Sequence, residues 1–414
     1  MPLAANDGYL PALDGLRFIA AMLVAGGHYT GMSESGVFPE LLGTFTGLGM
    51  TLFFVLSGFV IHYNYHATIQ KPGGFRLFMA ARFARLYPLY IALFLFEFTY
   101  VLISARSACG RAGEPGAQFV GLLSFLTFTQ SWIYTVICDK SLIYQYGPIS
   151  AVSWSISVEL FFYLAYALIA NVAGRRQLSP LGIVGCAAAI YSLTLIYFWL
   201  CGIYQAKIDS VGLAAFGPAA STADGYNDSL LRWLLYFNPL ARLGEFFVGM
   251  ATAMFFLKRR SQKTEITGAL ASLVTLAAIG LVLGAHLWLY MAPHDLLIGR
   301  IASPLYAPLV AIMMYCVVQF VTPWSRFLAQ PLMVRFGQAS YSIYLLHEVF
   351  PSMFKRLGIE AAGPAAAWAL WVAALAMLAI VSRVSYLKIE SPARLAVRKL
   401  LAPQLARRGL PHDV

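Results

Sequence analysis

Apolar stretches of roughly twenty residues recur along the entire chain, and this feature constrains the fold more than any other. A helix needs about 20 residues to cross the hydrocarbon core of a bilayer. The composition agrees, since 60% of the 414 residues are hydrophobic and 11% are charged, against about 45–50% and about 25% in soluble domains. The sequence therefore predicts an all-α membrane protein and excludes a soluble enzyme, a disordered chain and a disulfide scaffold. The eleven candidate stretches are 11–31, 45–65, 87–105, 119–137, 153–172, 181–203, 231–257, 266–290, 299–321, 339–355 and 364–386.

The distribution of basic residues predicts the orientation. The net charge is +11, and the lysines and arginines flank apolar runs, which is typical of membrane orientation rather than of nucleic-acid binding. The connections 66–86 and 174–178 are both basic and therefore cytoplasmic, so an even number of crossings must separate them, yet three stretches lie between. The polar stretch 119–137 is the best non-crossing candidate. We expect an extracytoplasmic re-entrant or interfacial segment there and a bundle of about ten spans.

This topology places both termini in the cytoplasm. Residues 1–390 form the predicted membrane domain, and 391–414 form a basic tail that is too short for a further soluble domain. The connection 204–230 is the longest polar one and lies outside. It is either a solvated connector or a segment that contacts a substrate.

Cysteine usage argues against a metal centre and a disulfide framework. Only five cysteines occur, and none forms a CxxC pair, so we expect no metal. Cys109 and Cys138 both fall on the outer side. They form one disulfide or remain two free thiols.

Ionisable residues inside membrane spans are costly and are functional candidates by default. The first stretch contains Arg17 and His28. Eleven residues turn a helix about 20° past three full turns and rise about 16.5 Å, so both side chains share one face. Asp14 precedes Arg17 by three residues and is placed to pair with it. The simpler alternatives are an interfacial arginine and a packing histidine.

Glu159 follows the polar run that begins at Ser153 and opens the stretch 153–172. It lies about 9 Å below the predicted outer surface, at a depth similar to that of His28. A carboxylate at this depth would orient the imidazole and stabilise its protonated form. The alternative is that Glu159 pairs with a basic residue for assembly.

Arg82 and Arg85 precede the third stretch at the predicted inner surface. Arginines three residues apart share a helix face and suit phosphate recognition. The alternative is that they only determine topology, because every predicted inner connection is basic.

Three more ionisable residues fall near the middle of predicted spans. Arg242 and Glu245 are three residues apart, so we expect a buried ion pair that holds the bundle together, with substrate lining as the second role. His347, next to Glu348, is either a packing histidine or part of the same cavity as His28.

Six segments in a fixed order carry a family resemblance. They are Leu13–Ala21 with His28, Phe53–Phe59, Arg82-x-x-Arg85 with Tyr87-Pro88, Trp154–Glu159, Arg242-x-x-Glu245-Phe246 with Gly249, and Ser340–His347. With these segments the chain resembles the acyltransferase-3 family of bacterial membrane acyltransferases. The resemblance covers nearly the whole chain.

The resemblance implies a reaction and a place for it. Such a protein takes an acyl group, usually acetyl, from cytoplasmic acetyl-CoA or another acyl-CoA and delivers it across the bacterial inner membrane. The acceptor is a hydroxyl of an extracytoplasmic glycan, such as an exopolysaccharide or O-antigen, or of its lipid-linked precursor. Peptidoglycan, a glycolipid and a small secondary metabolite remain open as acceptors.

The resemblance also assigns roles by motif. His28 becomes the catalytic residue with Arg17 as its functional partner, Glu159 becomes essential, and Arg82 and Arg85 engage the CoA phosphates. Further acceptor-binding or cavity-lining candidates are Ser57, Trp154, Ser155, Arg242, Glu245 and His347.

Two mechanisms and three rival functions stay open at this stage. Either His28 removes the proton of the acceptor hydroxyl during direct transfer, or it carries the acyl group covalently. The oxyanion would be stabilised by Arg17, Ser57 or a serine of 153–157. The rivals are a secondary transporter that uses buried charges, a non-catalytic sensor or scaffold, and a membrane acyltransferase that acts on lipids or proteins.

Overall fold

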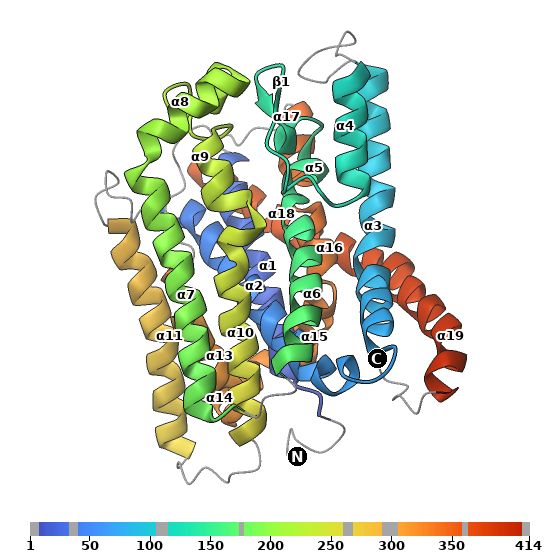
Figure 1. Cartoon of the computed structure of the whole chain (residues 1–414), viewed down its shortest axis with the longest axis vertical. Coiled ribbons are helices and arrows are strands. Elements are labelled where there is room, and N and C mark those ends of the chain that lie inside the picture. Colours follow the sequence, from blue (N-terminus) through green and yellow to red (C-terminus); the bar gives the residue numbers. More distant parts are fainter. Residues whose placement is uncertain are drawn as a thin grey trace. The chain divides into compact units, whose positions relative to one another are not determined.

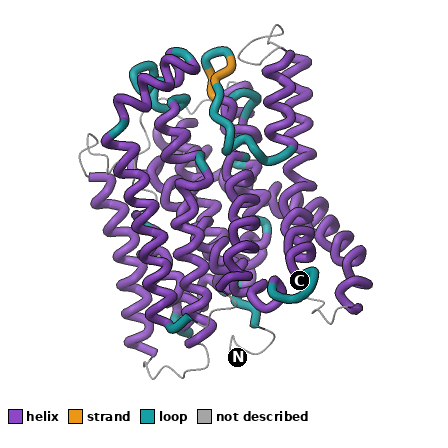
Figure 2. Tube along the Cα trace, viewed as in Figure 1, coloured by secondary structure: helices purple, strands orange, loops and turns teal. Residues whose placement is uncertain are grey.

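The computed structural model describes residues 8–32, 40–104, 115–173, 178–259, 268–291, 305–357 and 363–407. Within these ranges the chain is almost entirely helical, and a two-stranded hairpin is the one described sheet (Figure 2). The fold class predicted from the apolar stretches, an all-α membrane protein, is confirmed.

Seven helices of the described ranges are long and apolar enough to cross a membrane. They cover 40–69, 74–103, 148–170, 180–203, 230–259, 268–291 and 364–397. Each overlaps a predicted stretch. The predicted stretch 299–321 corresponds to the shorter helix α13 (Ala307–Gln319), and its first residues lie outside the described ranges. The predicted number of about ten spans stays a prediction.

The chain divides into two compact units, each assembled from separate segments. Unit 1 comprises Met1–His66, Gln177–Tyr191 and Glu245–Lys388, and unit 2 comprises Ala67–Arg176, Ser192–Gly244 and Ile389–Val414. The helices α7 (Pro180–Ile203) and α10 (Pro239–Arg259) contribute residues to both.

Unit 1 is built around α1 (Pro11–His28). This helix contacts α13, α14, α15, α16 and α18, and α11 and α13 run side by side (Figure 1). The bounds of these and the neighbouring helices are α2 Glu40–Ile69, α11 Gly268–Met291, α14 Pro323–Leu328, α15 Pro331–Gln338, α16 Ser340–Leu346, α17 Val349–Arg356 and α18 Pro364–Ser385, with the 3₁₀ turn η1 at Tyr29–Met32.

Glycines let the helices of unit 1 approach backbone to backbone. A Cβ atom added at Gly58 of α2 would lie 2.0 Å from the carbonyl oxygen of Phe246 in α10, and one added at Gly249 would lie 2.0 Å from that of Val55 in α2. The two helices therefore meet through a reciprocal pair of glycines. At Gly15 of α1 the nearest atom would be the Leu328 carbonyl oxygen, at 2.2 Å.

Unit 2 contains α3 (Gly74–Ser104) and α6 (Trp154–Ala173), and α3 contacts both α6 and the C-terminal α19 (Ser391–Arg407). The predicted division into a membrane domain of residues 1–390 and a tail of residues 391–414 stays a prediction. The shorter elements of unit 2 are α4 Pro115–Leu126, β1 Val136–Ile137, β2 Lys140–Ser141, η3 Leu142–Tyr144, α5 Pro148–Val152, α8 Gln205–Phe216, η4 Pro218–Ala220, α9 Leu230–Arg232 and η5 Trp233–Phe237. The turn η6 (Tyr386–Glu390) contributes residues to both units.

The segment predicted not to cross, 119–137, is divided between a short helix and the hairpin. Helix α4 has 12 residues, which gives it a length of about 18 Å, well short of the roughly 30 Å hydrocarbon core. The strands β1 and β2 follow, with Val136 opposite Ser141. Such a segment is too short and too irregular to span a bilayer as one helix.

The hairpin turn is formed by Cys138 and Asp139. Both have positive φ, 49° and 62°, as the two central residues of a type I′ turn require. Cys138 is disulfide-bonded, whereas Cys186, Cys201 and Cys316 are free. The predicted partner, Cys109, lies outside the described residues.

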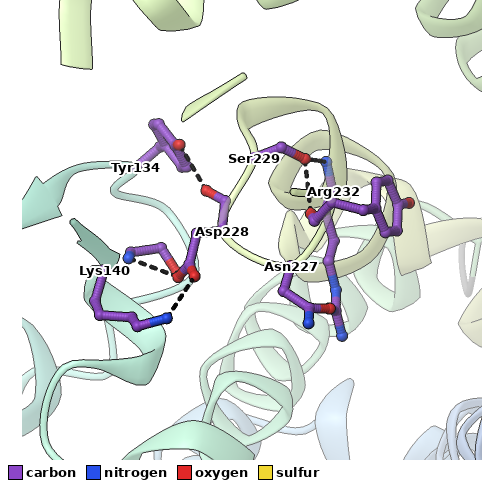
Figure 3. A network of polar contacts seen from close by, with 8 residues as sticks. Tyr134, Lys140, Asn227, Asp228, Ser229 and Arg232 are labelled. Atoms are coloured by element: carbon purple, nitrogen blue, oxygen red, sulfur yellow. Dashed lines mark hydrogen bonds and ion pairs between the residues drawn. The ribbon is translucent and has the colours of Figure 1, made fainter. Parts of the chain in front are cut away.

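Asp228 anchors the hairpin to the segment before α9 (Figure 3). The backbone N–H and the hydroxyl of Ser141 both donate to Asp228 Oδ1, at 2.8 and 2.9 Å, and Lys140 Nζ lies 3.3 Å from Oδ2. The Tyr134 hydroxyl donates to the Asp228 carbonyl oxygen at 2.8 Å. Burial raises the pKa of the Tyr134 phenol, which keeps this donor protonated. The predicted connection 204–230 therefore not only contains helix α8 but also holds the hairpin in place through Asp228.

Candidate active site

His28 is the last residue of α1, and its imidazole is paired with a carboxylate of unit 1. The His28 Nδ1 atom contacts the Glu348 Oε1 atom, and the side chains are 38% and 23% exposed. A carboxylate that accepts a hydrogen bond from Nδ1 fixes the ring orientation and keeps the hydrogen on Nδ1. The Nε2 atom of an accessible imidazole is then left with its lone pair available.

Packing around the end of α1 explains why His28 lies where it does. Helix α1 contacts α16 and α18, and the indole N–H of Trp371 in α18 donates to the Gly26 carbonyl oxygen at 3.0 Å. Helix α16 ends at Leu346, so His347 and Glu348 form the link to α17. The last turn of α1 and this link are therefore held together by contacts within unit 1.

His347 lies beside the pair and is buried. Its side chain is 1% exposed, and its ring centroid lies 5.0 Å from that of His28 at an interplanar angle of 71°. The Nδ1 atom contacts the Tyr344 carbonyl oxygen, so this nitrogen carries the hydrogen. The Nε2 atom lies 3.9 Å from Glu348 Oε1, which is too far for a hydrogen bond.

His28, His347 and Glu348 also form a donor set that fits a divalent cation. One ligand atom from each lies within 4.8 Å of the others. Two imidazoles and one carboxylate are ligands that Zn²⁺ takes in proteins. The sequence, judged by its cysteines, gave no reason to expect this.

The predicted pair of Arg17 and Asp14 is present. Arg17 Nη1 lies 3.7 Å from Asp14 Oδ1, with both side chains largely covered, and the Tyr9 hydroxyl donates to Asp14. Arg17 therefore lies about 16.5 Å along α1 from His28, and its guanidinium is paired with the Asp14 carboxylate. Its functional partnership with His28 stays a prediction.

Unit 2 gathers Arg82 and Glu159 around one tyrosine. The Tyr163 hydroxyl donates to Glu159 Oε1 at 2.6 Å, and the Arg82 guanidinium carbon lies 5.9 Å from the Tyr163 ring centroid. Arg82 is 8% exposed and Arg85 is partly buried. The sequence placed these arginines before the third apolar stretch and on one helix face, and α3, which begins at Gly74, contains both the arginines and residues 87–104 of that stretch. Glu159, which the sequence assigned to an outer site, thus lies near Arg82, which it assigned to phosphate binding.

The coupling of Glu159 to His28 stays a prediction, because the two residues belong to different units. In the structure the carboxylate on His28 is that of Glu348. Sequence reasoning noted Glu348 only as the neighbour of His347. The available signal was an adjacent histidine and glutamate inside the apolar stretch 339–355, where ionisable residues are costly.

Trp154 and Ser155, two of the remaining candidates, are buried at the start of α6. Trp154 is 4% exposed and its ring lies 4.9 Å from that of Tyr236. The Ser155 hydroxyl donates to the Val152 carbonyl oxygen at 3.3 Å. These contacts give both residues a packing role in unit 2. Ser57 is partly buried in α2 of unit 1.

Arg242 and Glu245 are fully buried. Arg242 Nε donates to the Tyr236 carbonyl oxygen at 3.0 Å, and its guanidinium carbon lies 4.4 Å from the Tyr236 ring centroid. Glu245 Oε1 accepts the Thr51 hydroxyl at 2.6 Å. Each has a partner in its own unit, and the ion pair between them stays a prediction.

The fold and the site together define a class of protein. It is a multi-pass membrane protein that carries an accessible histidine–carboxylate pair at the end of its first helix, together with arginines packed against tyrosine in its second unit. Such an arrangement suits proton transfer at one place and anion binding at another.

Comparison with known proteins then gives the family. The acyltransferase domain model of the acyltransferase-3 family matches residues 10–387. The chain belongs to this family of membrane acyltransferases, as the ordered motifs predicted.

Two of the three relatives described next are named for acyl transfer. The chain is 26% identical over 385 residues to acyltransferase MdmB of Streptomyces mycarofaciens, covering 90% of this chain and 87% of that protein. It is 22% identical over 401 residues to a Staphylococcus aureus protein named for an inferred O-acetyltransferase activity. It is 23% identical over 286 residues to regulator of hypoxia-inducible factor 1 of Caenorhabditis elegans. The matches cover 57% and 51% of the latter two proteins, and 93% and 60% of this chain. No solved structure matches.

Proposed function

We propose that this protein transfers an acetyl group from cytoplasmic acetyl-CoA to a hydroxyl of an extracytoplasmic glycan or glycan precursor. Membership of the acyltransferase-3 family supports acyl transfer, and the name of the Staphylococcus aureus relative supports acetyl and oxygen as donor group and acceptor atom. The protein acts in the bacterial inner membrane, with both termini in the cytoplasm. The observation that carries the proposal is the pair of His28 and Glu348 at the end of α1.

His28 acts as the general base in this reaction. A hydroxyl is a poor nucleophile until a base removes its proton. Glu348 holds the Nδ1–H of His28, so Nε2 receives the hydroxyl proton as the oxygen attacks the thioester carbonyl carbon. The C–S bond then breaks, and the proton passes from the imidazolium to the CoA thiolate. The carboxylate stabilises the imidazolium between these two steps.

Unit 2 binds the donor. Arg82 and Arg85 engage the CoA phosphates, as arginines suit phosphate groups. Tyr163 supports this role, since its ring packs against the Arg82 guanidinium and its hydroxyl is held by Glu159. Glu159 therefore acts as a positioning residue for the donor-binding face, and its essential character follows from that position.

Release of CoA by purified protein in lipid nanodiscs tests the proposal. Acetyl-CoA is supplied with a crude surface-polysaccharide or precursor extract, and acetyl-ester formation on the extract is followed by mass spectrometry. We expect CoA release coupled to ester formation in the wild type, and neither in a folded His28→Ala variant. Absence of both in the wild type with every extract and donor would overturn the proposal.

A further inference from the structure

The side chain of His347 contains a buried polar atom that the proposed chemistry does not use. Its Nε2 atom is buried and forms no hydrogen bond among the residues that the structure describes. Its Nδ1 atom is engaged by the Tyr344 carbonyl oxygen, so the buried Nε2 atom carries a lone pair. A buried polar group without a partner is costly. Something that accepts this lone pair would therefore be favoured at this position.

The arrangement of His347 is the one that metal-binding histidines adopt. A ligating imidazole almost always donates its other N–H to a carboxylate or a backbone carbonyl, which fixes the tautomer and the ring orientation. His347 meets this condition through Tyr344. Its free Nε2 atom lies 3.9 Å from Glu348 Oε1, and this oxygen in turn contacts His28 Nδ1.

We infer that His28, His347 and Glu348 form a binding site for a divalent transition-metal ion of the zinc type. Their ligand atoms lie within 4.8 Å of one another, and tetrahedral ligands at Zn–N distances of about 2.0–2.1 Å are separated by about 3.4 Å. A small rotation of the partly exposed His28 and Glu348 side chains brings the ligand atoms to this shorter separation. The His28 side chain is 38% exposed, so one ligand of the site reaches the surface of the protein.

Occupation of this site regulates the proposed reaction. This consequence rests on the proposed function, because it concerns the same imidazole. An ion on His28 Nδ1 displaces the hydrogen that Glu348 holds, and the neutral ring then carries its hydrogen on Nε2. The Nε2 atom can no longer accept the hydroxyl proton. The metal-bound protein is therefore the inactive form.

Metal binding is measured without any substrate, so that failure of the proposed function leaves this test intact. Tag-free protein in detergent is titrated with Co²⁺, and the visible absorption bands of bound Co²⁺ report its coordination. We expect one saturable ion per chain in the wild type. Because these variants remove a ligand itself, we expect Glu348→Gln and His347→Asn to weaken binding by at least the roughly 10–100-fold that loss of an outer-shell partner costs. The first of them preserves the size of the side chain.

A control variant separates this site from a second histidine pair. His62 and His66 lie four residues apart in α2, with stacked rings, and neither belongs to the ligand set formed by His28, His347 and Glu348. His66→Ala should bind Co²⁺ as the wild type does. Unsaturable binding in the wild type, or equal affinity in wild type and Glu348→Gln, would overturn the site.

Inhibition is then tested on wild-type acetyl transfer. We expect Zn²⁺ at saturating concentration to abolish CoA release and a chelator to restore it. Undiminished transfer with the site occupied would overturn the regulatory role.

Discussion

Glu348 holds the imidazole of His28 by its Nδ1 atom, although 319 residues separate the two positions in the chain. The carboxylate comes from the link between α16 and α17, and the imidazole from the end of α1. The pair therefore depends on the packing of α1 against α16 and α18. It joins His28 of the first sequence motif to the residue that directly follows the last motif, within unit 1.

Replacing the carboxylate tests its electrostatic role. Glu348→Gln keeps the size of the side chain but cannot stabilise an imidazolium, so we expect kcat to fall by about 10²–10⁴-fold with little change in the KM for acetyl-CoA. Steady-state CoA release measures both constants. Glu40→Gln, at an exposed position that begins α2, is the matched control. A kcat within twofold of the wild type in Glu348→Gln would show that the carboxylate does not assist His28.

The proposed role of Arg82 and Arg85 in donor binding predicts the opposite kinetic pattern. Arg85→Gln removes a guanidinium group that we propose contacts the CoA phosphates, so we expect the KM for acetyl-CoA to rise by about 10- to 100-fold with kcat much less affected. Arg76→Gln, an exposed change near the start of the same helix, should leave KM unchanged. Equal effects of the two substitutions would mean that net charge, rather than a specific contact, determines donor affinity.

The reciprocal glycines of α2 and α10 predict a packing defect. Gly249→Ala places a Cβ atom 2.0 Å from the Val55 carbonyl oxygen, and the helices must separate to accommodate it. We expect a loss of about 1–3 kcal/mol, measured as a lower midpoint of thermal unfolding in detergent. Gly280→Ala in α11 meets no atom within 4 Å and should not lower the midpoint. Similar midpoints in both variants would contradict the close approach.

The Asp228 anchor predicts a local effect on the hairpin. Asp228→Ala removes the acceptor of the Ser141 backbone N–H and hydroxyl, so we expect the hairpin to open more readily by about 1–3 kcal/mol. Hydrogen exchange at the Ser141 amide measures this opening. Asp224→Ala, at an exposed position of the same connection, provides the comparison and should leave that amide protected. Unchanged protection in Asp228→Ala would show that the hairpin holds without its anchor.

The sequence was sufficient for the fold class and for the family. Apolar length and the placement of charge are local properties, and each predicted stretch could be recognised without knowledge of its neighbours. The i, i+3 pair of Asp14 and Arg17 is local in the same way, and the structure contains it. The apolar stretch 87–105 covers only part of α3, because hydropathy marks the membrane core, whereas the helix extends through the preceding polar residues back to Gly74.

The partner of His28 could not be read from spacing along the chain. Helix geometry indicates which residues of α1 share a face, but it carries no information about which distant segment packs against that face. Depth in the membrane suggested Glu159, whose coupling to His28 stays a prediction, but it gave no sign of Glu348, which the packing of α16 against α1 brings to the imidazole. The tautomer of His347 likewise depends on its local turn at Tyr344.

The central claim is that the imidazole of His28, held by Glu348, transfers the proton during acyl transfer. The most direct measurement is CoA release coupled to acetyl-ester formation by nanodisc-embedded wild type, His28→Ala and His66→Ala, each shown to be folded by its thermal unfolding midpoint. The account predicts turnover in the wild type and in His66→Ala and none in His28→Ala. Turnover by His28→Ala at the wild-type rate would contradict it.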